Sequence, residues 1–165
     1  MKVFYKVLVL SLSLLFVISP NSYANEDNYN KDIKIKKQKT REKQVVNITN
    51  DELILLSRLI AGEARGESYE GQLAVAAVVI NRVKDERFPD NVKDVIYQKN
   101  AFSVVKNGQI NINPTELSIK AAQEALYGKD PTNNAIYFWN PDIATCNWIK
   151  TLNPYLRIGN HVFAK

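Results

Sequence analysis

The chain has 165 residues and a formal net charge of +5 at pH 7, yet this excess charge lies entirely in its first 50 residues. The segment 25–50 carries seven basic and four acidic residues, and residues 51–165 carry 13 of each sign. A nucleic-acid-binding domain needs a basic face, so the neutral balance of 51–165 argues against a nucleic-acid partner. The single cysteine excludes an internal disulfide, and the domain must therefore rely on its apolar core.

Residues 1–24 have the pattern of a signal peptide. Lys2 and Lys6 precede the apolar run 7–18, and Ser-Tyr-Ala at 22–24 fits a small-x-small cleavage site. The run is short for a transmembrane helix, so the pattern predicts export, with an uncleaved membrane anchor as the alternative. The segment 25–50 is rich in lysine and poor in large apolar residues, which predicts a disordered linker.

Residues 51–165 are predicted to form one domain, and its first helix is expected to start at Asn50. Thr49 and Glu52 have the Thr-x-x-Glu spacing of a capping box just ahead of an apolar run. Gly62 and Gly66 then indicate that the helix ends close to residue 63.

Glu63 is the candidate catalytic residue of this helix. At 100° per residue it falls within about 60° of Leu56 and Ile60, on the apolar stripe. Burial and the negative end of the helix dipole would both favour the neutral acid, which is the form that a general acid needs. Arg65 would oppose this if its guanidinium folded back, and the competing interpretation of Glu63 is a solvated or ion-paired charge.

A second helix is predicted from a cap at Ser68 to about Val83. Its middle, LAVAAVVI, is apolar on nearly every side, which is typical of a helix at the centre of a domain. Glu67 and Glu70 are expected at its start, where negative charge is favoured. A loop over 85–90 and a short helix over 92–97 follow.

The remaining elements mix strand and helix signals. Asn107-Gly108 between apolar residues predicts a hairpin over 102–112. The next helix is expected to have Asn113 as its N-cap, Pro114 and Glu116 in its first turn, and Gly128 after its end. Strands are predicted over 135–139 and over 157–163. The fold class is therefore α+β, with a helical core and a small antiparallel sheet.

The residue inventory restricts the chemistry. One histidine, His161, and one cysteine, Cys146, make an all-protein zinc site improbable, and we expect no metal or cofactor. No G-x-S-x-G motif occurs. A Cys146/His161 thiol dyad remains an alternative, although a lone cysteine among aromatics is more often inert. Carboxylate chemistry beside an aromatic groove is the remaining class, with Tyr69, Phe102, Tyr137, Phe138, Trp139, Trp148 and Tyr155 as candidates for stacking on sugar rings or for the core.

Four strings carry a resemblance to a known family: LIAGEARGESYEGQLAVAAVVINRV, AFSVV with the NG that follows, AIYFWNP and RIGNHVFAK. On these strings residues 52–165 resemble the SleB/CwlJ family of cell-wall hydrolases, the spore cortex-lytic enzymes. The resemblance implies a lysozyme-like helical core and cleavage of peptidoglycan glycan strands, with muramic-δ-lactam cortex as the typical substrate. It also implies action in the cell wall, the spore cortex or the extracellular space.

The resemblance further implies site residues. The family's acidic catalytic residue matches Glu63, the first glutamate of E-A-R-G-E, and Glu67 in the same motif is a possible second carboxylate. Further positions on the family's strings that would line the groove and bind substrate are Asn81, Phe102, Ser103, Tyr137, Asn140 and His161. SleB-type members carry an N-terminal peptidoglycan-binding domain that has no counterpart here, and CwlJ-type members usually lack a leader. The stage of action, whether germination, vegetative wall turnover or sporulation, stays open.

The sequence thus predicts an exported, monomeric peptidoglycan glycosidase, specifically a lytic transglycosylase in which Glu63 is acid and then base. No protein regulator is indicated. The alternatives are a non-catalytic peptidoglycan-binding module and a Cys146/His161 amidase or peptidase.

Overall fold

The computed structural model describes residues 43–165, which belong to one compact unit. The predicted signal peptide, 1–24, and the predicted linker as far as residue 42 lie outside the described residues. The helices are α2 (Asn50–Glu63), α3 (Tyr69–Lys84), α4 (Val92–Tyr97), α5 (Ser103–Lys106) and α6 (Glu116–Leu126), with short 3-10 turns at η2 (Gln109–Asn111) and η3 (Ile149–Thr151). The strands are β1 (Tyr137–Trp139), β2 (Leu156–Ile158) and β3 (His161–Ala164).

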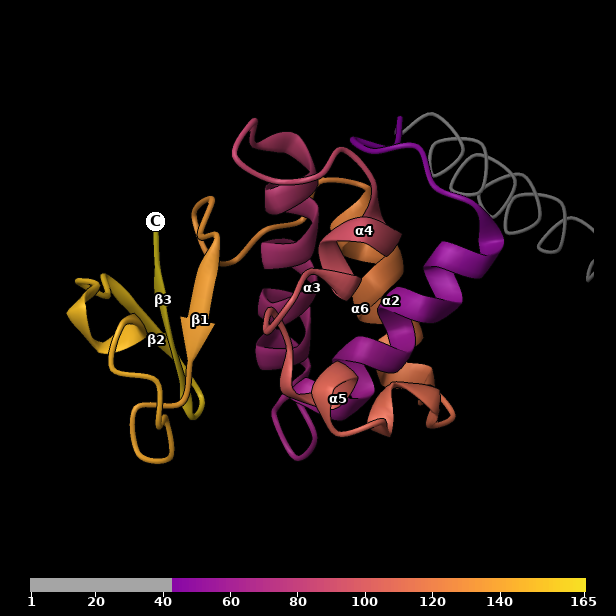
Figure 1. Cartoon of the computed structure of the whole chain (residues 1–165). Coiled ribbons are helices and arrows are strands. Elements are labelled where there is room, and N and C mark those ends of the chain that lie inside the picture. The colour runs from indigo at the N-terminus through magenta and orange to yellow at the C-terminus, as the bar shows by residue number, and fades with distance from the viewer. Residues whose placement is uncertain (1–42) are drawn as a thin grey trace, which may run out of the picture. The chain divides into compact units, whose positions relative to one another are not determined.

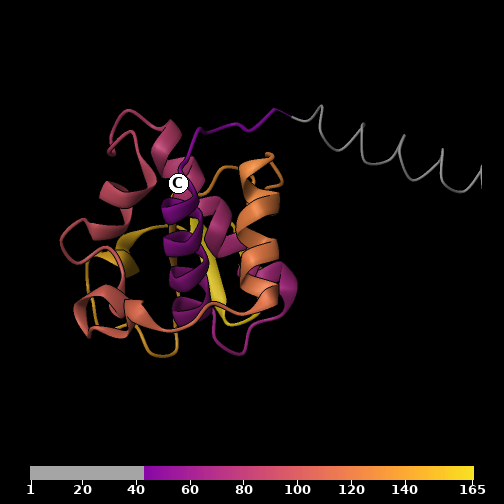
Figure 2. The same cartoon turned by 90° about the vertical axis from the view of Figure 1, so that its right-hand side faces the viewer.

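Helix α3 lies at the centre, between the sheet on one side and the other helices on the other (Figure 1). A view turned by 90° shows α2 and α6 side by side in front of the sheet (Figure 2). The uniformly apolar sequence of α3 accounts for this position. Val75 and Val79 enter the core shared with α2, α4 and α6, whereas Ala74 and Val78 pack against Phe163 of β3. The prediction of an α+β fold with a helical core and a small antiparallel sheet is confirmed.

The sheet has the strand order β1-β3-β2, and both pairings are antiparallel. Phe163 in the central strand β3 pairs with Phe138 of β1 and with Leu156 of β2. The single strand predicted over 157–163 is wrong, because the chain reverses within it and forms a β2–β3 hairpin. Gly159 makes this turn with a positive φ of 58°, a conformation that L side chains rarely adopt.

Two consecutive polar residues of α3 tie the helix to the segment that leads into β1. The Asn81 Nδ2 atom donates to Asp130 Oδ2 at 2.9 Å and to the Ala135 carbonyl at 3.1 Å, and Arg82 Nε donates to the Ile136 carbonyl at 2.7 Å. Both side chains are buried. A buried carbonyl that loses its donor costs about 1–3 kcal/mol, so these contacts fix where β1 starts relative to α3.

The hairpin predicted over 102–112 is wrong. The segment instead forms α5 and η2, joined at Gly108. Phe102, Val104 and Ile110 are all buried in the core shared with α2 and α3. Helical turns bring these three side chains to one core, whereas an isolated two-stranded hairpin would have no third strand to pair with.

The helix starts were predicted with mixed success. Helix α2 starts at Asn50 with the complete Thr49/Glu52 capping box, and α3 is capped by Ser68, as predicted. The predicted N-cap of α6 at Asn113 is wrong. Thr115 caps α6 in a reciprocal pair with Ser118, whose hydroxyl bonds back to the Thr115 backbone. This pair satisfies two amides at the helix start, so Pro114 precedes the helix.

The described part of the predicted linker contacts the domain. The Val45 amide donates to the Leu126 carbonyl at 2.8 Å, and Val46 and Ile48 pack on the helical core. The ordered unit therefore begins before residue 51. Within residues 43–165, no helix combines the length and the apolar character needed to cross a membrane.

Candidate active site

Glu63 is the last residue of α2, and its half-buried carboxylate contacts the start of α5. Its Oε1 atom accepts from Ser103 Oγ at 3.0 Å and from the Val104 amide at 2.9 Å. Amides in the first turn of a helix have no intrahelical acceptor, so Val104 N–H is free to donate outward. Oε2 accepts no hydrogen bond from any described residue.

Helix α5 can approach the end of α2 because residue 62 is glycine. A Cβ atom at Gly62 would lie 2.6 Å from Val104 Cγ1, well inside ordinary van der Waals contact. Val104 is itself buried in the helical core. The packing of Val104 against the Gly62 backbone thus positions the Ser103 hydroxyl and the Val104 amide, which donate to Glu63.

The Arg82 guanidinium lies among three aromatic rings. Its central carbon is 5.3 Å from the centroid of Phe88, 5.0 Å from that of Phe102 and 5.8 Å from that of Tyr137. Burial lowers the pKa of Arg82 to about 10, while the charges of Tyr137 and Glu63 act in the opposite direction. Arg82 therefore stays cationic at neutral pH and supplies positive charge near Glu63.

On the sheet side, β3 begins with His161. The residue is 8% exposed, and its ring meets Phe138 edge-on at 5.2 Å between centroids. Burial lowers the pKa of His161, against the opposing charges of Glu67 and Glu63. The imidazole is therefore neutral near pH 7 and lies within electrostatic reach of both carboxylates.

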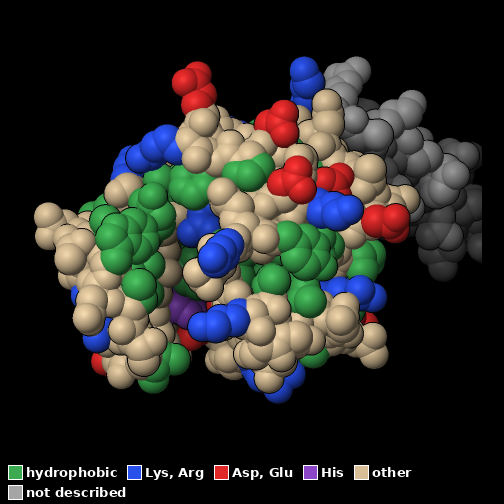
Figure 3. All heavy atoms as spheres, viewed as in Figure 1, with side chains coloured by type: hydrophobic (Ala, Val, Ile, Leu, Met, Phe, Trp, Pro, Cys, Tyr) green, Lys and Arg blue, Asp and Glu red, His purple; other side chains and the backbone are tan. Residues whose placement is uncertain are grey.

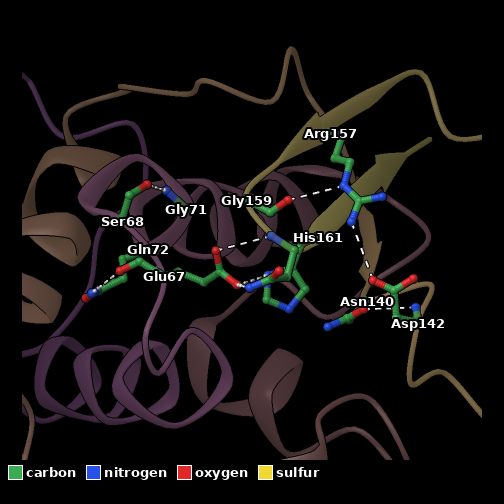
Figure 4. A network of polar contacts seen from close by, with 10 residues as sticks. Glu67, Ser68, Gly71, Gln72, Asn140, Asp142, Arg157, Gly159 and His161 are labelled. Carbon is green, nitrogen blue, oxygen red and sulfur yellow. Dashed lines mark hydrogen bonds and ion pairs between the residues drawn. The ribbon is translucent and has the colours of Figure 1, made fainter.

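Glu67 lies in the loop between α2 and α3 and reaches across to the β2–β3 turn (Figure 4). Oε1 accepts from Asn160 Nδ2 at 2.9 Å, and Oε2 accepts from the Asn160 amide at 3.3 Å. Oε1 is also 3.7 Å from His161 Nδ1, and the Glu67 side chain is only 6% exposed. In Figure 4 one ring nitrogen of His161 faces the Glu67 carboxylate and the other points away from it.

Most of the predicted site residues gather at the junction between the helices and the sheet. Figure 3 shows a hollow there, with the histidine inside it and apolar and basic side chains at its rim. The contacts described above connect Glu63, Ser103, Phe102, Tyr137, His161 and Glu67 to this junction.

Two predicted groove residues have other contacts. Asn81 donates to Asp130 and to the Ala135 carbonyl. Asn140 uses Oδ1 to accept from the Asp142 amide at 2.9 Å in the loop after β1. Both contacts are structural, and a role in the groove stays a prediction for these two residues.

Sequence reasoning missed three groups of the site. The Val104 amide and the Asn160 backbone and side-chain donors lie next to predicted site residues, but an apolar residue and a turn asparagine gave no signal of their own for a contact with Glu63 or Glu67. Arg82 carried a signal, a cation within an otherwise apolar helix, and that signal was not used.

The thiol of Cys146 is exposed and makes no hydrogen bond within the described part of the chain. His161 contacts Glu67 and Phe138 instead, so nothing here builds a Cys146/His161 dyad. Among residues 43–165, no group of three His, Cys, Asp or Glu side chains could hold a metal ion.

Known proteins that are similar to this chain indicate its family. The family model described as Cell Wall Hydrolase matches residues 66–164. The spore cortex-lytic enzyme of Bacillus cereus is 45% identical over 117 residues, which cover 71% of this chain and 45% of that protein. The spore cortex-lytic enzyme of Bacillus subtilis is 44% identical over the same length, covering 38% of that protein. The chain thus spans less than half the length of these curated relatives.

Solved structures match more completely. The catalytic domain of the germination-specific lytic transglycosylase SleB from Bacillus anthracis is 44% identical with a TM-score of 0.69, over 72% of this chain and 98% of that one. The catalytic domain of the Bacillus cereus SleB protein is 42% identical with a TM-score of 0.68, over 76% and 97%. The chain belongs to the cell wall hydrolase family, and the resemblance seen in the sequence is confirmed. Within that family its described domain is similar to the catalytic domain of SleB.

Proposed function

We propose that the protein is an exported peptidoglycan glycosidase that works as a lytic transglycosylase, with Glu63 as its general acid and base. The observation that carries this proposal is the presentation of the Glu63 carboxylate. Oε1 accepts from Ser103 and Val104, and Oε2 accepts no hydrogen bond from any residue in 43–165. One fixed and one available oxygen is the arrangement that a proton donor to a bound substrate requires.

The reaction needs only one carboxylate. Protonated Glu63 gives its proton to the glycosidic oxygen as the bond from that oxygen to the muramyl C1 breaks. Ionised Glu63 then takes the proton of the muramyl C6 hydroxyl as its oxygen bonds to C1, which closes a 1,6-anhydro ring and restores the acid. The nucleophile is tethered to the reacting sugar, so its attack is intramolecular. A hydrolase would need a second group to activate water or to attack, as two-carboxylate glycosidases do.

The residues around Glu63 can stabilise negative charge on its carboxylate and can bind a sugar ring. The Arg82 cation lies close enough for its charge and that of Glu63 to interact, and it stabilises the carboxylate that forms on proton transfer. Tyr137 is half-buried beside it, and Trp148, 55% exposed, meets the Tyr137 ring edge-on at 5.4 Å. Exposed aromatic faces of this kind can stack on sugar rings.

The relatives support the substrate class. One similar protein is named a spore cortex-lytic enzyme, and another a germination-specific lytic transglycosylase. We infer from these names that this chain also cleaves peptidoglycan. The proposal includes export through residues 1–24, a linker that ends before Val45, and action in the cell wall, the cortex or the extracellular space. Muramic-δ-lactam cortex and ordinary wall peptidoglycan are the two substrates to compare.

The test is a product analysis. Purified protein is incubated with cortex and with vegetative sacculi, half of each digest is reduced with borohydride, and the muropeptide masses are compared. Products ending in 1,6-anhydromuramic acid, unchanged by borohydride, are expected. Reducible muramic termini as the main product would contradict the transglycosylase assignment, and release of peptides alone would favour an amidase. Binding to sacculi without any cleavage would instead support the non-catalytic module.

A further inference from the structure

The two glutamates of the E-A-R-G-E motif have opposite environments. Glu63 leaves one carboxylate oxygen without a described partner, whereas both oxygens of Glu67 accept from Asn160. The Glu67 side chain is 6% exposed. A carboxylate whose oxygens are both engaged at a protein turn cannot approach an anomeric carbon or align a water molecule against it. The geometry therefore argues against Glu67 as a second catalytic carboxylate.

The turn that Glu67 holds is shaped to admit its carboxylate. Gly159 takes a positive φ of 58°, and a Cβ atom built there would overlap Glu67 Oε2. The next two residues are Asn160, which donates twice to Glu67, and His161, which starts β3. A buried charge is stable only when it is hydrogen-bonded, so the Glu67 carboxylate depends on the donors and the space that this turn provides.

An unsatisfied imidazole nitrogen faces the Glu67 carboxylate. His161 Nδ1 is buried, has no hydrogen-bond partner among residues 43–165, and lies 3.7 Å from Glu67 Oε1. A bare lone pair on Nδ1 would face the lone pairs of the carboxylate, whereas an Nδ1–H group would face an acceptor. Burial lowers the pKa of His161, so the ring carries a single proton near neutral pH and Nδ1 is its favoured position.

We propose that Glu67 is a positioning residue that fixes His161 as its Nδ1–H tautomer and so presents Nε2 as a hydrogen-bond acceptor in the hollow beside Glu63. A hydroxyl or amide N–H of the glycan is the chemical class of donor that this nitrogen accepts. A closure of less than 1 Å would turn the 3.7 Å approach into a hydrogen bond of ordinary length. The substrate half of this inference rests on the proposed function, and the tautomer half does not.

The chain offers a direct test because it contains one histidine. Protein labelled with ¹⁵N-histidine gives a single imidazole, whose two nitrogen shifts report the tautomer in the free protein. In the unmodified chain at pH 7.5 we expect a protonated-type shift for Nδ1 and an unprotonated-type shift for Nε2. The reverse assignment would overturn the proposal without any variant being made.

The variant Glu67→Gln sharpens the test. Its amide cannot accept from both Asn160 donors and from Nδ1–H, so an NH₂ group must face one of them. We expect the tautomer population to move towards Nε2–H. The matched control is Glu70→Gln, the same change at an exposed position three residues away, which should leave both shifts in place. A Glu67→Gln protein that folds with wild-type shifts would contradict the proposal.

Kinetics separate positioning from catalysis. Loss of one oriented hydrogen bond should lower kcat/KM by roughly 5–10-fold in Glu67→Gln, with KM carrying part of the change. In a His161→Gln background, whose amide oxygen offers an acceptor near the position of Nε2, Glu67→Gln should have little further effect. A loss as deep as that of Glu63→Gln, with the tautomer unchanged, would make Glu67 catalytic. If no lytic product is ever found, the proposed function fails while the tautomer result stands.

Discussion

The helices pack against one another through apolar contacts, whereas the sheet is attached to them largely through polar contacts. The helices α2, α3, α4 and α6 share one aliphatic core, so their packing follows from apolar periodicity. The sheet adds only small apolar clusters, and three buried polar side chains, Asn81, Arg82 and Glu67, tie it to α3 and to the loop before α3. Glu63 comes from the first part and His161 from the second. The shape of the site therefore depends on the polar ties more than on the core.

The largest effect is expected on the helical side of the site. Glu63→Gln keeps the Oε1 contacts with Ser103 and Val104 but removes the transferable proton, and muropeptide release should fall by about 10²–10⁴-fold. Circular dichroism melts should match the unmodified protein, because half-buried Glu63 is not part of the core. Near wild-type release by a folded Glu63→Gln protein would remove this residue from the mechanism.

The next effect is expected at the junction. Arg82→Ala leaves the Ile136 carbonyl without its donor and removes three contacts with aromatic rings. The free energy of unfolding should fall by about 2–4 kcal/mol, measured by urea denaturation. The control Arg87→Ala removes an exposed cation paired with Asp85, and its denaturation midpoint should barely move. Equal midpoints for the two variants would mean that the junction does not depend on Arg82.

The starts of α2 and α3 were predictable because they depend on neighbours in sequence, whereas the start of α6 was predicted two residues too early. The Thr49/Glu52 box and the Ser68 cap are local, and both predicted starts were confirmed. Asn107-Gly108 is also a valid local turn signal, but burial of flanking side chains in a core built from distant segments overrode it. Sequence periodicity could place Glu63 near the core, but it could not reveal that an amide of α5 would bind it.

A smaller effect is expected from titration on the sheet side. Burial lowers the pKa of His161 below its ordinary value of about 6.5, with Glu67 on the α2–α3 loop and Glu63 on α2 opposing the shift. The unfolded chain therefore binds a proton first as pH falls, so the free energy of unfolding should decrease from about pH 7.5 towards the folded-state pKa and then level off. His161→Gln should flatten this step. A profile with the same slope in both proteins would assign the step to another group.

The smallest effect is expected at the exposed loop of the sheet part. Alkylation of Cys146 with iodoacetamide should leave glycan cleavage unchanged, because its thiol is exposed and contacts no described site residue. The matched control is Cys146→Ser treated in the same way. Inhibition of the unmodified chain but not of Cys146→Ser would revive the thiol amidase or peptidase alternative.

The absence of a side chain at Gly62 limits the conformational freedom of the Glu63 side chain before substrate binds. A free glutamate side chain loses up to about 2 kcal/mol of rotamer entropy when it is fixed in one orientation. Here the Val104 amide, which cannot rotate away, already orients Glu63, because nothing at position 62 separates α5 from α2. That entropy is lost on folding and not on binding. The Glu63 carboxylate should thus be oriented before the glycan binds. A methyl group at residue 62 would restore part of the rotamer freedom of Glu63.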